Sequence, residues 1–165
     1  LRIGWIASAD KTMVSAISDN KHYLSICNSA PSEVLTLIAL RAKETIVGRI
    51  RVIIASNEAY LGQYMAKYPT LLSWTAPKGG CTGFMRLHVP EHIDLAEVTE
   101  RLVQDHGVLI LPGENFPITS EGNVGSIKKH FRVGLGRQAF PAALDAFEIA
   151  LPKVLKEMGV EIASV

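Results

Sequence analysis

Two arginines lie in segments whose other residues are typical of strands. Arg2 stands in the apolar run at 1–6, and Arg132 stands in the segment HFRVGLGR at 130–137. In a strand with period-two alternation, the apolar neighbours of Arg132 face a core. Arg132 then shares the opposite face with Gly134, which leaves room for a ligand. A planar, always-charged guanidinium binds a carboxylate through two parallel hydrogen bonds. Spacing alone still favours a simpler interpretation, a solvated strand arginine.

Other motifs give no site of their own. His88 and His92 are four residues apart, but Pro90 between them excludes the helix on which two imidazoles would share a metal ion. The segment GLGRQA at 134–139 matches a dinucleotide-binding pattern, yet only 165 − 139 = 26 residues follow it, without a further strand. The glycine-rich turn at 79–83 lacks the Lys-Ser/Thr pair of a phosphate-binding loop. We therefore predict no metal site and no nucleotide site.

Composition narrows the class of protein. The chain has 165 residues, of which 48% are hydrophobic and 20% charged, so it can form a core and is not disordered. Lys plus Arg number 17 and Asp plus Glu 16, a net charge of +1, which argues against a nucleic-acid or membrane surface as its partner. No apolar run reaches the roughly 20 residues that span a bilayer. With two distant cysteines, these features predict a protein of the reducing cytoplasm.

The hydrophobic pattern predicts which elements position the two arginines. Apolar periodicity and turn residues indicate a strand at 1–8, helices at 10–23, 31–42 and 49–68, strands at 71–76 and 84–89, a helix after Asp94, strands at 108–111 and 130–135, and a last helix from Pro141. Pro152 is expected to kink or split that last helix. Residues 115–129 are predicted to form a mobile loop.

The order of these elements predicts the architecture. In the second half it is β, β, α, β, β, α, which favours an α+β layer in which helices cover one face of a sheet. The fold class is α/β, with a mixed sheet in a small α+β domain and a long interdomain helix. We expect the remnant of a larger domain at 1–48, the interdomain helix at 49–69 and the small domain at 70–165. Because the chain starts without Met inside a predicted strand, we expect it to be a piece of a longer enzyme.

Four segments in this order resemble one known family. They are LRIGWIAS at 1–8, PKGG at 77–80, GVLILPGENF at 107–116 and HFRVGLGR at 130–137. Each is weak alone, but together they resemble the C-terminal part of class I/II pyridoxal-phosphate-dependent aminotransferases, which have the aspartate aminotransferase fold type. The similarity covers nearly the whole chain.

The resemblance implies roles for individual residues. It makes Arg2 the arginine that binds the phosphate of pyridoxal phosphate, and Arg132 the arginine that binds the substrate α-carboxylate. It places Asn115 and Phe116 in a loop of the small domain that approaches the substrate. The lysine that forms the Schiff base with the cofactor would precede Leu1. The resemblance therefore implies no catalytic residue within the chain, and an isolated chain without activity.

The resemblance also implies a reaction and partners. The parent enzyme would transfer an amino group between an amino acid and a 2-oxo acid, as a cytoplasmic homodimer that binds neither nucleic acid nor membrane. Two alternatives stay open. The same scaffold supports other pyridoxal-phosphate reactions, those of a lyase, a synthase or a decarboxylase, because function lives in the site and not in the fold. A non-catalytic α+β binding module is the other alternative.

Overall fold

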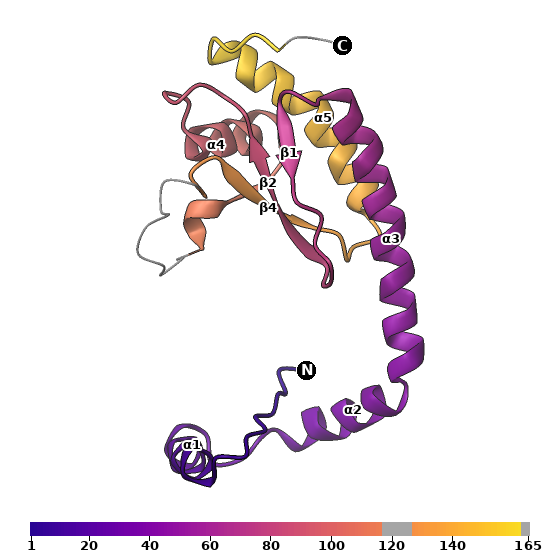
Figure 1. Cartoon of the computed structure of the whole chain (residues 1–165), viewed down its shortest axis with the longest axis vertical. Helices are drawn as coiled ribbons and strands as arrows, with labels where there is room; N and C mark the ends of the chain where they lie inside the picture. The colour runs from indigo at the N-terminus through magenta and orange to yellow at the C-terminus, as the bar shows by residue number, and fades with distance from the viewer. Residues whose placement is uncertain (117–126, 163–165) are drawn as a thin grey trace. The chain divides into compact units, whose positions relative to one another are not determined.

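The computed structural model of the chain describes residues 1–116 and 127–162 and divides into two compact units, Leu1–Arg49 and Ile50–Val165 (Figure 1). Helix α3 (Lys43–Lys67) begins in the first unit and ends in the second. In the described part of the chain, no helix combines the length and hydropathy needed to cross a membrane. The division at 1–48, 49–69 and 70–165 stays a prediction.

The first unit is helical. It contains α1 (Lys11–Leu24), α2 (Ala30–Arg41) and the start of α3, which begins six residues before the predicted start at 49. Asp10 caps α1, because its Oδ1 accepts hydrogen bonds from the backbone N–H groups of Thr12 (2.9 Å) and Met13 (3.1 Å). Pro31 lies in the first turn of α2, where a missing N–H costs no helical hydrogen bond. The first two predicted helices are thus confirmed.

The predicted strand at 1–8 is wrong. These residues form no regular secondary structure, and Arg2 has a φ of 58°, outside the extended region. A strand needs a neighbour with which to exchange backbone hydrogen bonds, and the described residues of the first unit contain no other strand.

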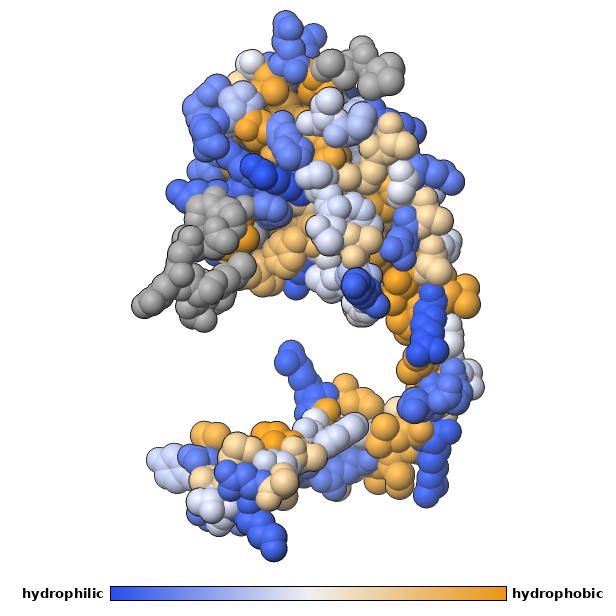
Figure 2. All heavy atoms as spheres, viewed as in Figure 1, coloured by the Kyte–Doolittle hydropathy of each residue, from blue (hydrophilic) through white to orange (hydrophobic). Residues whose placement is uncertain are grey.

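Residues 1–49 have no buried side chain, although many of them are apolar. Figure 2 shows apolar residues at the surface of α2 and the start of α3. The large exposed apolar residues of this unit include Trp5, Ile6, Val34, Leu35, Leu37, Ile38 and Leu40. Taken by itself, this unit therefore contains enough apolar residues for a core, but none of their side chains is buried.

The second unit contains a four-stranded sheet. Its strands are β1 (Leu72–Trp74), β2 (Thr82–Leu87), β3 (Leu111–Pro112) and β4 (His130–Gly134), in the order β1-β2-β4-β3. All three pairings are antiparallel, so within the described residues the sheet is antiparallel throughout and not mixed. β3 covers only the end of the strand predicted at 108–111, because only Leu111 and Pro112 have partners in β4. Of the loop predicted at 115–129, residues 117–126 lie outside the described residues.

Helices cover one face of this sheet, as predicted. They are α4 (Leu95–His106), α5 (Phe140–Glu157) and the C-terminal half of α3 (Figure 1). Side chains alternate along β2 and β4, so Met85, Leu87, Phe131 and Val133 enter the core. The Phe131 and Phe147 rings, with centroids 5.6 Å apart, join β4 to α5. The α/β class is confirmed.

The ends of the helices follow from local sequence. Asp94 caps α4 by accepting a hydrogen bond from the Ala96 N–H (2.9 Å), and Gly107, in the left-handed conformation with φ 66°, ends it. Pro152 does not split α5, which runs as one helix to Glu157. Proline removes a single helical hydrogen bond, while Leu151, Val154 and other side chains next to it are buried in the core.

Helix α3 is fixed to the second unit by a buried polar contact. Asn57, of which only 3% is exposed, donates hydrogen bonds from its amide to the carbonyl oxygens of Leu135 (2.8 Å) and Arg137 (2.7 Å). These two residues follow β4 directly. Leu61 and Tyr64, one and two turns further along α3, lie in the core.

Tyr64 is expected to make the second unit less stable at alkaline pH. Burial raises the pKa of its hydroxyl above the ordinary value of 10.0. Above pH 10 the unfolded state loses a proton that the folded state keeps, so stability is full below that pH and falls as pH rises. We expect Tyr64→Phe to make this fall less steep above about pH 10.

Urea unfolding of the full chain measures this effect. In a Trp5→Phe background, Trp74 fluorescence reports on the second unit alone, because the chain has two tryptophans. The matched control is Tyr23→Phe, since Tyr23 is 91% exposed and its hydroxyl is not withdrawn from water by folding. If the free energy of unfolding fell equally steeply with pH in Tyr64→Phe and in the unchanged chain, Tyr64 would not be responsible for the loss of stability.

Candidate functional site

The face of the sheet opposite the core carries the candidate site. The side chains of β2 and β4 that alternate with core residues are exposed on this face, and they include Thr82, Phe84, Arg86 and Arg132. Arg132 therefore lies on the face that the sequence predicts for it. Gly134 is on the same face, and a Cβ added to it would have no atom within 4 Å. The expected room beside Arg132 is present.

Arg132 is placed by strands on both sides. Its Cα is opposite that of Phe84 in β2 and that of Leu111 in β3. The Cζ atom of its guanidinium lies 5.3 Å from the centre of the Phe116 ring, which is within the range of a cation–π contact. No carboxylate in the described part of the chain forms an ion pair with Arg132. Its charge is thus available to a ligand.

Two aromatic rings stand beside this guanidinium. The Phe84 and Phe116 rings have centroids 5.3 Å apart and planes at 87°, an edge-to-face arrangement that aromatic pairs favour. The structure thus brings Arg132 and Phe116, both predicted from the sequence, into contact. It adds Phe84, which sequence reasoning missed as a site residue. The available signal was the placement of Phe84 on the exposed face of its strand, but only the register of β2 and β4 puts it opposite Arg132.

A pocket of about 980 Å³ includes Arg132 in its wall. Strand β4, the segment 107–111 and the N-terminal half of α5 line most of it with apolar side chains. Arg137 also lines it, as does Gly136, whose added Cβ would lie 3.2 Å from the Cβ of Cys81. Met85, Phe131 and Val133 in this lining belong to the core face of the sheet, and neither Phe84 nor Phe116 lines the pocket, so it is not the space beside the Arg132 guanidinium.

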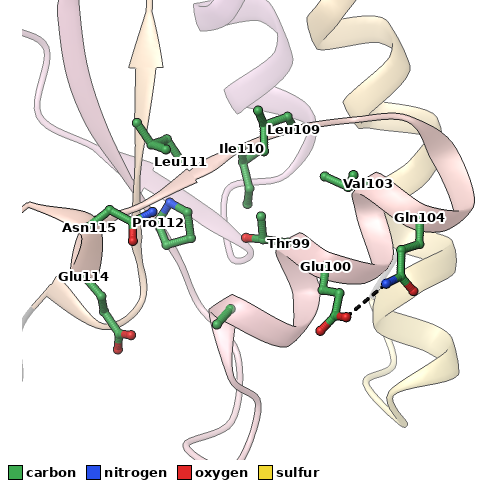
Figure 3. A pocket seen from close by; sticks show the side chains of 11 residues that line it. Thr99, Glu100, Val103, Gln104, Leu109, Ile110, Leu111, Pro112, Glu114 and Asn115 are labelled. Atoms are coloured by element: carbon green, nitrogen blue, oxygen red, sulfur yellow. Dashed lines mark hydrogen bonds between the residues drawn. The ribbon is translucent and has the colours of Figure 1, made fainter.

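Asn115 lines a different pocket. It ends the 3-10 helix η1 (Gly113–Asn115) and borders a space of about 390 Å³ between α4 and residues 109–115. Figure 3 shows Thr99 of α4 on one side of this space and Pro112 and Asn115 on the other, while Glu100 accepts a hydrogen bond from Gln104 one turn along α4. Arg132 is not among the residues that line it. The structure therefore does not bring Asn115 and Arg132 into one pocket, and a substrate contact of Asn115 stays a prediction.

Gly113 lets the chain pass from β3 to Phe116. A Cβ on Gly113 would lie 2.7 Å from the carbonyl oxygen of Ile127 and 3.0 Å from that of His130. The first contact is closer than real Cβ atoms tolerate, the second is unusually tight, and both are with backbone. Glycine at this position therefore allows the turn that delivers Phe116 to the site.

Arg2 lies in the first unit. Its guanidinium is exposed, and none of the described carboxylates forms an ion pair with it. Its predicted role at a cofactor phosphate stays a prediction. The described residues also contain no group of three or more His, Cys, Asp or Glu side chains that could hold a metal ion.

Solved structures share this fold. A pyridoxal-phosphate-dependent aminotransferase from Streptococcus suis is 24% identical and matches 93% of this chain with a TM-score of 0.74. The α-aminoadipate aminotransferase from Thermus thermophilus is 18% identical and matches 90% with a TM-score of 0.71. A pyridoxal-phosphate-dependent cyclase is 22% identical and matches 87% with a TM-score of 0.71.

Sequence comparison gives a more limited match. Capreomycidine synthase from Streptomyces vinaceus is 26% identical over 125 residues, which are 76% of this chain and 31% of that protein. No protein-family model matches the chain.

These likenesses define the fold as the one found in pyridoxal-phosphate-dependent aminotransferases, and they confirm the fold that the sequence predicts. The chain spans 37%, 38% and 37% of the length of the three solved structures.

Proposed function

We propose that this chain forms the C-terminal part of a pyridoxal-phosphate-dependent aminotransferase, and that Arg132 binds the α-carboxylate of the substrates. The observation that carries the proposal is the environment of Arg132, a guanidinium without an acidic partner in the described residues, held at an aromatic ring on the exposed face of the sheet. An amino acid and the 2-oxo acid derived from it share an α-carboxylate. One guanidinium therefore serves both directions of amino-group transfer.

The contribution of Arg132 to the reaction is orientation. Two parallel hydrogen bonds to the carboxylate fix both its position and its plane, which a single point charge does not. Once the carboxylate is held, the remaining freedom is rotation about the single bond between the carboxylate carbon and Cα. This rotation decides which substituent of Cα faces the reacting groups. Orientation of this kind lowers an activation barrier by several kcal/mol.

The proposed cofactor is pyridoxal phosphate, which supplies an electron sink for the electrons of a bond broken at the substrate Cα. Arg2 is the residue of this chain that we propose for its phosphate. An exposed guanidinium without an acidic partner in the described residues has the right chemistry, since its fork of donors matches phosphate oxygens. We propose no residue of the chain for the Schiff base, and we expect no transamination from these 165 residues alone. The parent is proposed to be a cytoplasmic homodimer.

A single-turnover experiment tests amino-group transfer. The parent enzyme is mixed with an amino acid in the absence of any 2-oxo acid. We expect the bound cofactor to become its pyridoxamine form while a stoichiometric amount of the 2-oxo acid is released. Adding a different 2-oxo acid then regenerates the cofactor and yields a new amino acid.

The comparisons favour a second candidate, a synthase or cyclase reaction on the same fold. A named synthase and a named cyclase are among the proteins that this chain resembles. In the same experiment such an enzyme consumes the amino acid, leaves the cofactor in its original form and needs no 2-oxo acid. That result would replace the aminotransferase proposal and keep the carboxylate role of Arg132.

A further inference from the structure

We infer that Phe84 is a positioning residue: it holds the ring of Phe116 against the guanidinium of Arg132 and so fixes that guanidinium for a carboxylate ligand. The ligand part of this inference rests on the proposed function. The contact between the three side chains does not, because it is a property of the chain by itself.

The backbone places Phe84 next to Arg132. The two residues are direct partners in the antiparallel pairing of β2 and β4. Side chains of directly opposite residues share a face, with Cβ atoms about 4.5–5.5 Å apart. Phe84 is 36% exposed, so a large apolar ring remains partly in water, between the polar side chains of Thr82 and Arg86 along β2.

Phe116 reaches the pair from a separate part of the chain. It follows η1 and stands edge-to-face to Phe84, with the two planes at 87°. The ring of Phe116 thus contacts Phe84 and Arg132 at equal centroid distances, 5.3 Å to the Phe84 ring and 5.3 Å to the guanidinium Cζ. Removing the Phe84 ring leaves Phe116 without this aromatic support beside the strand.

The ring contact orients Arg132 without neutralising it. A carboxylate partner would occupy the N–H donors of the guanidinium, whereas an aromatic ring attracts the cation and leaves those donors for a ligand. An unsupported arginine side chain has many rotamers and loses that freedom when a ligand binds. Holding the guanidinium in advance reduces this loss, so we expect the aromatic pair to raise affinity for a carboxylate.

The first test is spectroscopic and uses the full chain. The side-chain N–H resonance of Arg132, identified by its loss in Arg132→Lys, is expected upfield because a guanidinium over a ring face is shielded. Phe84→Leu keeps an apolar side chain without a ring and should move this resonance toward the position of a free arginine. Phe84→Tyr keeps the ring and should restore it. Tyr23→Leu, which removes an exposed ring from the first unit, is the control and should have no effect.

A double mutant tests whether Phe84 acts through Phe116. Phe116→Leu should abolish the upfield shift, and adding Phe84→Leu to it should change nothing more. Equal shifts in the unchanged chain and in Phe84→Leu would overturn the inference. Additive effects of the two substitutions would overturn it as well, because they would show that Phe84 acts on Arg132 independently.

Acetate titration at constant ionic strength, with chloride as the balancing anion, tests the ligand part. We expect Phe84→Leu to weaken acetate binding at Arg132 about two- to fivefold, the range of an exposed cation–π contact, and Phe84→Tyr to restore it. A ring-dependent shift without any acetate binding in the unchanged chain would support the positioning of Arg132 and overturn its proposed carboxylate role. Equal acetate affinities for the unchanged chain and Phe84→Leu would overturn the role of Phe84 in ligand binding.

Discussion

Replacing Arg132 with alanine in the parent enzyme is expected to lower kcat/KM for its amino acid substrate by roughly a hundredfold or more. The substitution removes two hydrogen bonds to a charged group, which together are worth about 3 kcal/mol or more. Arg132→Lys should recover only part of the loss, because an ammonium group keeps the charge but not the planar fork. Steady-state kinetics with the amino acid and with the 2-oxo acid should show similar losses for both, since both carry the α-carboxylate.

Arg86→Ala is the matched control for this experiment. Arg86 is an exposed arginine on the same face of the same sheet, opposite His130 in the pairing of β2 and β4. If net positive charge on this face were responsible for binding, both variants would lose activity alike. Normal substrate affinity in Arg132→Ala would contradict the assignment of Arg132 to the carboxylate.

The second large effect is expected for stability, at Gly113. Gly113→Ala brings a methyl group within 2.7 Å of one backbone oxygen and 3.0 Å of another, so the chain between β3 and β4 must move. Forcing an extra carbon into a closely packed place costs about 2–3 kcal/mol. The urea midpoint reported by Trp74 in the Trp5→Phe background should fall accordingly, and the upfield shift of Arg132 should weaken as Phe116 is displaced.

Gly62→Ala provides the comparison. Gly62 lies inside α3, where an added Cβ meets no atom within 4 Å. The same chemical change should therefore stabilise the chain by about 0.5–1 kcal/mol, because alanine favours the helix. If Gly113→Ala and Gly62→Ala shifted the urea midpoint in the same direction, the close contacts of Gly113 would not determine whether its substitution stabilises or destabilises the chain.

Local signals predicted most elements of this chain. The cap residues Asp10 and Asp94 and the left-handed Gly107 act within one turn of the helix ends that they define. The alternation of β4 also correctly places Arg132 away from the core. Such features depend on neighbours in the sequence, and a single sequence contains them.

Features that depend on distant partners were missed or misjudged. The apolar run at 1–8 has the composition of a strand, but the described residues of its unit contain no strand with which to pair. Phe84 could not be assigned to the site, because its place opposite Arg132 follows from the register between two strands far apart in the sequence. Nor does the sequence reveal how Pro152 is accommodated, which depends on the core around α5.

The anchoring of Asn57 has a practical consequence for making shorter versions of this protein. Helix α3 resembles a linker when only its length is considered, yet its later turns supply core side chains and the amide that holds the end of β4. An expression clone that starts after Lys67 would leave the backbone oxygens of Leu135 and Arg137 without that donor. A clone that starts at Ile50 keeps the Asn57 amide, and it is the shortened version to try for crystallisation or isotope labelling.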